Sequence, residues 1–267
     1  MRFTRRDMAK MATIGAAATA AGGGSAQAQA SGRNFVLVHG AWHGGWCWHE
    51  VATALRNAGH RVHTPTQTGL GERRHLLSRE ITLGTFAEDV ANVLIYEDLE
   101  DVVLVGHSFA GMTISGVADR MPERLRQLIF LDSLVLESGH APFDGIPPDV
   151  VAARIKAAEE TSGGLSLPTP PASAFGIEDE ALQKAVEAKL TPHPLSTYQA
   201  KLTLKNPVAN GLPATYIICT DPIYGPLESS RQLAQNKGWN IREIATGHDA
   251  MVSAPKETAE LLMDIAG

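Results

Sequence analysis

The chain has 267 residues and lacks the features that mark several common classes of protein. It contains only two cysteines, Cys47 and Cys219, and no Cys/His cluster at zinc spacing, which argues against a disulfide framework and a structural zinc site. Each cysteine stands beside a predicted core element, so we expect two buried free thiols. His39 and His43 are four residues apart in a glycine-rich loop rather than on a helix, and we therefore expect no metal and no cofactor.

An excess of charge of one sign is also missing. The formal net charge is -6 at pH 7, and no basic stripe follows any segment, which argues against a nucleic-acid partner. There is no acidic tail and no internal repeat. Hydrophobic residues make up 44% of the chain, which is normal for a soluble globular protein, and the length suits one α/β domain with a large core.

The N-terminal hydrophobic run, residues 11–18, is too short and too rich in small residues to span a bilayer as a permanent helix. It follows the paired Arg5 and Arg6 and precedes overlapping A-x-A sites at residues 26–30. This order is typical of a secretory signal, and the twin arginines resemble a bacterial twin-arginine (Tat) signal. We expect residues 1–30 to be a signal peptide read by the Tat export machinery, and the mature protein to be periplasmic or secreted, with no stable membrane span.

Beyond the N-terminal segment, short apolar runs alternate with segments of helical periodicity. The expected strands are residues 34–39, 61–64, 101–105, 125–131, 214–220 and 240–244. The expected helices are residues 46–58, 85–98, 110–121, 227–235 and 253–265. Repeated alternation of strand and helix predicts an α/β fold with a doubly wound, mostly parallel sheet covered on both faces.

Residues 133–211 interrupt this alternation. The segment is rich in Pro, Ser and Gly and contains two helical pieces, near residues 149–160 and 178–190. It is short for a separate domain. We therefore expect residues 31–267 to form one domain, in which this insertion is a cap that covers a pocket at the strand ends and sets the choice of substrate.

A strand, a sharp turn and a helix meet at one serine. The apolar run Val102–Val105 ends at Gly106, and the helical run begins after Ser108, with Ala110 and Gly111 as small neighbours. This pattern is a nucleophile elbow, G-x-S-x-G, with alanine in place of the second glycine. The turn holds the serine hydroxyl exposed at the end of the sheet, so the pattern predicts that Ser108 is a nucleophile.

A serine needs a base to remove its proton, and His248 is the best placed of ten histidines. It follows the last predicted strand and precedes the last helix, at the edge of the sheet where open α/β sheets build their sites. The order of nucleophile first and histidine last along the chain matches that of hydrolases with a nucleophile elbow.

Three further motifs carry a resemblance to a known family. They are residues 36–48 (VLVHGAWHGGWCW), residues 69–73 (GLGER) and residues 247–252 (GHDAMV). Together with the elbow and the late histidine, they resemble the α/β-hydrolase fold, and within it the bacterial esterase relatives of the plant methylesterase and hydroxynitrile lyase branch. The likeness covers residues 34–266 and implies an α/β-hydrolase domain.

The resemblance implies the roles of several residues. Ser108 matches the nucleophile and His248 the general base, and the backbone N–H groups of Ala41 and Phe109 match the two donors of an oxyanion hole. The implied activity is that of a serine esterase with a Ser-His-Asp triad, which cleaves a small hydrophobic carboxylic ester through an acyl-enzyme. The aromatic and apolar residues Trp42, Phe143 and Met251 are candidates for its substrate pocket.

The acid of the triad stays open at this point, since the fold offers two places for it. Asp132 follows the strand after the elbow helix, as in haloalkane dehalogenases. Asp221 follows the next strand, at nearly the spacing of the methylesterases, and Glu137 is a third candidate. We favour Asp132 over Asp221.

Other functions on the same fold also stay open. They are hydrolysis of a carbamate or amide, carbon–carbon cleavage as in hydroxynitrile lyases, and binding of a small molecule without catalysis. Lyases of this branch have a lysine after the catalytic histidine and a threonine in the first oxyanion loop. This chain has Asp249 and Gly40 there, which favours hydrolysis.

Overall fold

The computed structural model describes residues 32–267, so the expected signal peptide at residues 1–30 lies outside the described part of the chain. The core is a six-stranded parallel sheet with the order β2-β1-β3-β4-β7-β8. Its strands are β1 (Asn34–Val38), β2 (Arg61–His63), β3 (Val102–His107), β4 (Leu125–Leu131), β7 (Ala214–Cys219) and β8 (Asn240–Ile244). The predicted doubly wound α/β sheet is confirmed, and each of its strands was expected.

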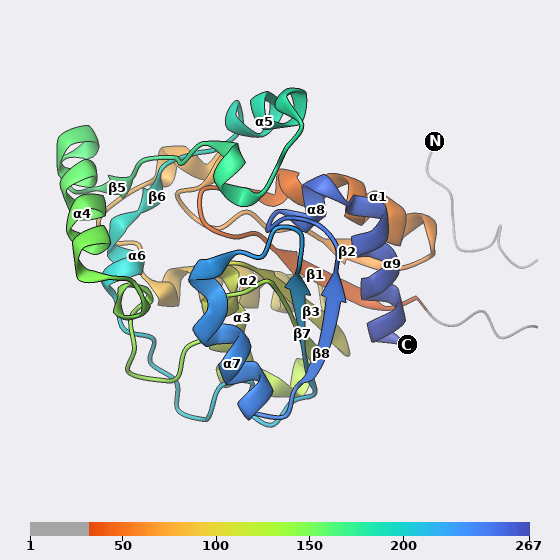
Figure 1. Ribbon diagram of the computed structural model, residues 1–267. Coiled ribbons are helices and arrows are strands. Elements are labelled where there is room, and N and C mark those ends of the chain that lie inside the picture. The colour runs from red at the N-terminus through yellow and green to blue at the C-terminus, as the bar shows by residue number, and fades with distance from the viewer. Residues whose placement is uncertain (1–31) are drawn as a thin grey trace, which may run out of the picture. The chain divides into compact units, whose positions relative to one another are not determined.

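Helices cover both faces of this sheet (Figure 1). One face packs on α1 (His49–Asn57), α8 (Ala250–Ser253) and α9 (Pro255–Ala266). The other packs on α2 (Leu83–Tyr96), α3 (Ala110–Arg120) and α7 (Glu228–Asn236). Alternate residues of β3 enter the two cores, Val103 and Val105 one of them and Leu104 the other. Burial on both faces explains why this strand is an unbroken apolar run rather than an alternating one.

The chain reverses its direction of winding at β1. From β1 it goes outward to β2 and then returns across β1 to β3, after which β4, β7 and β8 follow in order. The loops after β1 and β3 therefore diverge at the carboxyl ends of neighbouring strands. In an open parallel sheet this divergence creates a crevice, which is the usual place for a ligand or an active site.

The segment between β4 and β7 lies beyond the carboxyl ends of the strands (Figure 1). It holds α4 (Pro148–Ser162), α5 (Glu180–Glu187), α6 (Leu195–Gln199) and a small antiparallel pair formed by β5 (Ser166–Leu167) and β6 (His193–Pro194). The two expected helical pieces correspond to α4 and α5. Tyr198 and Leu202 pack with Phe109 of the main domain in one apolar cluster, so the cap segment and the elbow share a core.

Short 3-10 helices complete the fold. They are η1 (Gly45–Trp48), η2 (Gly71–Leu76), η3 (Pro122–Arg124), η4 (Pro142–Gly145), η5 (Ala172–Phe175) and η6 (Gly225–Leu227). Cys47 and Cys219 are both buried and free, as expected. Within the described residues, no helix is both long enough and apolar enough to span a membrane.

Candidate active site

Ser108 lies on the tight turn between β3 and α3. Its φ of 53° is in the left-handed region, a strained conformation that residues other than glycine rarely adopt and that is common at functional sites. A Cβ at Gly106 would lie 2.9 Å from Ile114 Cδ1, and one at Gly111 would overlap the carbonyl oxygen of Leu134. The positions at which neighbouring atoms leave no room for a side chain are therefore 106 and 111, which explains why alanine is tolerated at position 110.

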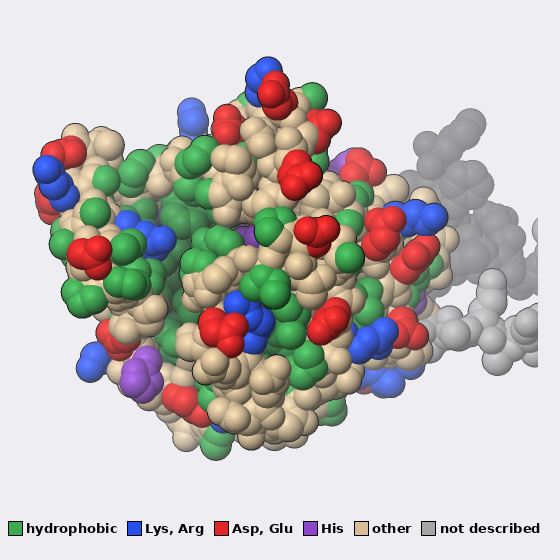
Figure 2. Space-filling view, viewed as in Figure 1, with side chains coloured by type: hydrophobic (Ala, Val, Ile, Leu, Met, Phe, Trp, Pro, Cys, Tyr) green, Lys and Arg blue, Asp and Glu red, His purple; other side chains and the backbone are tan. Residues whose placement is uncertain are grey.

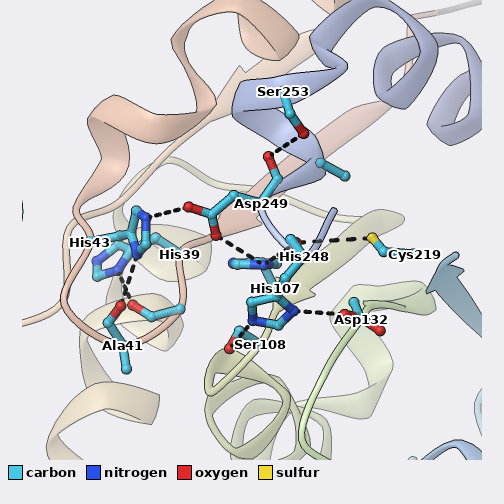
Figure 3. A network of polar contacts seen from close by, with 12 residues as sticks. His39, Ala41, His43, His107, Ser108, Asp132, Cys219, His248, Asp249 and Ser253 are labelled. Carbon is cyan, nitrogen blue, oxygen red and sulfur yellow. Dashed lines mark hydrogen bonds and ion pairs between the residues drawn. The ribbon is translucent and has the colours of Figure 1, made fainter. Parts of the chain in front are cut away.

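His248 joins Ser108 and Asp132 in one chain of hydrogen bonds (Figure 3). Its Nε2 lies 2.9 Å from Ser108 Oγ, and its Nδ1 lies 2.6 Å from Asp132 Oδ2. Because a carboxylate only accepts, Nδ1 carries the proton and Nε2 is free to accept the proton of the serine. Asp132 is fully buried and His248 is 2% exposed.

The other two candidate acids lie elsewhere. Asp221 follows β7 as expected, but its side chain is exposed, and Glu137 forms an ion pair with Lys237 at 2.7 Å. Instead of an acid, the loop after β7 brings Tyr224 to the histidine. The Tyr224 and His248 rings stack with their centroids 4.1 Å apart and their planes at 19°. Sequence reasoning missed Tyr224, since a tyrosine in a loop carries no signal of the ring it will contact.

A buried arginine stands behind the carboxylate. Arg231 of α7 is 6% exposed, and its Nη1 lies 3.7 Å from Asp132 Oδ1 and donates to the Tyr224 carbonyl at 3.1 Å. Its positive charge therefore lies beside the buried carboxylate of Asp132. It also connects the carboxylate to the loop that carries Tyr224. A sequence signal existed, because Arg231 occupies an inward position of a predicted amphipathic helix.

Two backbone N–H groups lie beside Ser108. A Cβ at Gly40 would be 2.7 Å from Ser108 Cβ, so the loop after β1 touches the serine directly and brings Ala41 next to it. Phe109 follows the serine in the elbow. Within residues 32–267, neither the Ala41 N–H nor the Phe109 N–H donates to a protein acceptor. Both donors are therefore available to an oxygen bound at Ser108.

A second network of buried polar groups lies behind the histidine (Figure 3). His43 Nδ1 contacts the Ala41 carbonyl oxygen at 2.8 Å, and its Nε2 contacts Asp249 Oδ2 at 3.0 Å. Both partners only accept hydrogen bonds, so both nitrogens of His43 carry protons. Burial alone lowers the pKa of His43, but the adjacent Asp249 carboxylate outweighs it, and the net pKa is raised. His43 and Asp249 thus form a buried ion pair.

His107, which precedes Ser108, connects this pair to His248. Its Nε2 donates to the His248 carbonyl at 2.9 Å and lies 3.7 Å from Asp249 Oδ1. Burial holds the pKa of His107 well below its usual value, so this ring is neutral. The network therefore connects the loop after β1, the elbow and the loop that carries His248.

Comparison with known proteins agrees with this geometry. The sequence profile of the alpha/beta hydrolase family matches residues 35–261. The chain belongs to the α/β hydrolase family. It is 41% identical to a carbendazim hydrolyzing esterase from Nocardioides sp. (strain SG-4G), over 86% of this chain and 98% of that protein.

More distant relatives come from plants and from a solved bacterial structure. Methylesterase 1 from Arabidopsis thaliana and norfluorocurarine synthase 1 from a Strychnos species are each 26% identical, over 88% of this hydrolase and 96% and 95% of those proteins. A solved extracellular alpha/beta-hydrolase from a Paenibacillus species matches with a TM-score of 0.77 and 26% identity, over 88% of this chain and 99% of that one. The predicted resemblance to bacterial esterases and plant methylesterases is confirmed.

A cavity that is partly open to solvent adjoins Ser108 and His248 in this hydrolase. Figure 2 shows a hollow with hydrophobic walls beside the cap segment. The residues that line the cavity are Trp42, Ser108, Phe109, Leu134, Leu136, Pro142, Gly145, Ile146, Arg154, Phe175, Tyr198, Tyr224, Pro226, Leu227, Ser229 and His248.

Of the three pocket residues expected from the sequence, the structure places only Trp42 on the cavity wall. Phe143 packs behind Tyr198, with the two ring centroids 5.3 Å apart, and does not reach the cavity. The expectation for Met251 was wrong. Met251 is fully buried among the residues of α1 and α9, and it borders a separate pocket next to α1 and α5 instead of the cavity at Ser108.

Proposed function

We propose that this hydrolase cleaves small hydrophobic carboxylic esters through an acyl-enzyme formed on Ser108. The observation that carries the proposal is the chain of hydrogen bonds from Ser108 through His248 to Asp132, at the wall of an apolar cavity. The names of the relatives, which include two esterases, support ester cleavage as the reaction.

In the first half of the reaction, His248 Nε2 takes the proton of Ser108 as Oγ attacks the carbonyl carbon of the ester. The carbonyl oxygen becomes an oxyanion, and the Ala41 and Phe109 N–H groups donate to it. When the tetrahedral intermediate collapses, the C–O bond to the alcohol breaks and the imidazolium of His248 protonates the leaving alkoxide. Ser108 then carries the acyl group.

In the second half, water attacks the acyl-enzyme and His248 takes one of its protons. The acid is released as the proton returns to Ser108 Oγ, so that the enzyme is regenerated. Throughout the cycle the Asp132 carboxylate accepts a hydrogen bond from the His248 Nδ1–H group and stabilises the imidazolium. Tyr224 covers the imidazole ring and limits its rotation, since the two rings are stacked.

Hydrolysis of a carbamate or amide of similar shape is the second candidate. The relative at 41% identity is named for the hydrolysis of carbendazim, and the same nucleophile, base and oxyanion donors would serve either carbonyl. A lyase reaction is less well supported. Asp249 stands where lyases of this branch have a cationic lysine, and its carboxylate points away from the cavity into the ion pair with His43.

The test is the hydrolysis of p-nitrophenyl esters from acetate to octanoate by the mature protein and by Ser108→Ala. Turnover by the wild type that disappears in the variant is expected. If no ester is turned over but a fluorophosphonate labels the wild type at Ser108, the substrate is a carbamate, an amide or a lyase substrate. Absence of both turnover and labelling would contradict catalysis and favour a binding protein.

A further inference from the structure

The cavity beside Ser108 has a polar wall whose hydrogen-bonding groups the reaction itself does not use. Apart from His248, its lining includes one basic side chain, that of Arg154 in α4, and no carboxylate. Within the described residues, Arg154 forms neither a hydrogen bond nor an ion pair with another side chain or with the backbone. Arg231, by contrast, has Glu228, Asp132 and the Tyr224 carbonyl as partners.

Arg154 lies on the inward face of its helix. Val151, Ile155 and Ala158 of α4 pack into the apolar cluster of the cap, and Arg154 follows Val151 by three residues and precedes Ala158 by four. Residues at these spacings share one face of a helix. An amphipathic helix normally has an apolar side chain at such a position. Arg154 is a half-buried residue on the wall of the cavity and has no acceptor among the described residues, so an anionic group of a bound ligand would supply the acceptor that the protein does not.

Two tyrosines extend this polar wall. Tyr198 of α6 and Tyr224 both line the cavity, and within residues 32–267 neither hydroxyl has a protein partner. Burial raises the pKa of both phenols, so both keep their protons and can donate. The Arg154 charge opposes the shift in each phenol, and all three side chains line the same cavity. The wall therefore combines one cation and two hydroxyl donors.

We propose that Arg154, Tyr198 and Tyr224 form a subsite for a carboxylate at the end of the substrate remote from the ester bond. The proposal rests on ester hydrolysis at Ser108 and narrows the substrate to esters with an apolar body and a terminal carboxylate. A planar guanidinium matches a carboxylate with two parallel hydrogen bonds, and the aromatic and aliphatic walls accommodate the body. The negative charge of Asp132 does not repel a carboxylate bound in this subsite, because His248 and Arg231 already flank the Asp132 side chain.

The test compares two esters of equal shape. One is the mono-p-nitrophenyl ester of adipic acid, and the other is p-nitrophenyl 6-methylheptanoate, in which a branched hydrocarbon end replaces the carboxylate. We expect the wild type to favour the adipate in kcat/KM by about tenfold or more, mainly through KM, as for a hydrogen-bonded charged group. Arg154→Gln should remove most of this preference. Arg154→Lys should keep an intermediate ratio, because lysine retains the charge but not the planar geometry.

Lys156→Gln is the matched control. Lys156 lies two residues further along α4, is exposed and pairs with Glu160, so the substitution removes the same charge from the outer face of the helix. Rates and ratio should stay at the wild-type level. Equal treatment of the two esters by the wild type, or the same effect of Arg154→Gln and Lys156→Gln, would overturn the proposal.

Binding of the two esters to Ser108→Ala, measured by calorimetry, tests the subsite without chemistry. The adipate should bind more tightly than its hydrocarbon counterpart, and adding Arg154→Gln should abolish the difference. Failure of the proposed function would appear as absence of turnover of every p-nitrophenyl ester by the wild type. Failure of the subsite proposal would appear as equal binding of the two esters to Ser108→Ala, whether or not the wild type turns them over.

Discussion

Replacement of Asp132 by asparagine tests the triad most sharply, because the surroundings of this side chain determine how the amide will orient. The carboxylate has His248 Nδ1 on one oxygen at 2.6 Å and Arg231 Nη1 near the other at 3.7 Å. In Asp132→Asn, the amide oxygen will face the guanidinium, since facing it with the NH₂ group would place donors against donors. The amide NH₂ then points at His248 Nδ1.

This orientation reverses the tautomer of the histidine. Nδ1 has to accept from the amide, so the proton moves to Nε2, which can no longer take the proton of Ser108. A carboxylate-to-amide change with this consequence has cost about 10⁴-fold in kcat in a serine protease, and about 10⁴-fold corresponds to roughly 5 kcal/mol in the barrier. We expect a loss of this order in kcat with little change in KM, because the cavity walls are untouched.

The assay is steady-state hydrolysis of a p-nitrophenyl ester, with thermal unfolding as the check on folding. Asp221→Asn is the matched control and should stay within about twofold of the wild type, because that side chain is exposed. Adding Arg231→Leu to Asp132→Asn frees the amide to rotate and should recover part of the activity. Wild-type kcat in Asp132→Asn, or an equal loss in Asp221→Asn, would refute the reasoning.

The remaining predictions concern the buried ion pair and the N-terminus. Asp249→Asn should destabilise the fold by about 3–5 kcal/mol, because it leaves His43 buried without its counter-charge. Because the pKa of His43 is raised in the folded protein, its contribution to the free energy of unfolding is complete below about pH 6.5. That contribution is lost as the pH rises through the folded-state pKa. Because the pKa of Asp249 is lowered in the folded protein, its contribution to the free energy of unfolding is present above about pH 3.8. That contribution is lost as the pH falls through the folded-state pKa. The difference in unfolding free energy between wild type and variant, measured by urea denaturation, should therefore be largest from about pH 4 to 6.5, and a difference that grows with alkaline pH would contradict the pair. For the N-terminus, we expect the exported protein to begin near Gln29 or Ser31; N-terminal sequencing that finds Met1 or Arg2 would rule out a cleaved signal.

The sheet and the two central side chains followed from local patterns in the sequence. A buried strand such as β3 is recognisable as an apolar run because both of its faces are covered. The small residues around Ser108 are required by the tight turn itself. His248 follows from its place after the last strand. Each of these signals lies within about ten consecutive residues, so a local pattern of apolar and small residues is enough to detect it.

The acid and the pocket needed the tertiary structure. Asp132 and Asp221 end neighbouring strands, so the sequence places both at the same edge of the sheet. Only the folded loops turn one carboxylate inward and leave the other exposed. Met251 was misplaced for a related reason, since the rotation of a four-residue helix cannot be inferred from so short a pattern.

The interactions that tie the site together join residues far apart in the chain. His43 and Asp249 are 206 residues apart, and Ser108 and His248 are 140 residues apart. In the sequence, Asp249 and Arg154 are simply a charged residue after a histidine and a charged residue in a helix. The protonation of His43 and the absence of a partner for Arg154 depend on which groups the fold brings within hydrogen-bond distance. The sequence thus determined the fold and the candidate nucleophile, while the candidate acid, the buried ion pair and the polar wall of the cavity were decided by packing between distant segments.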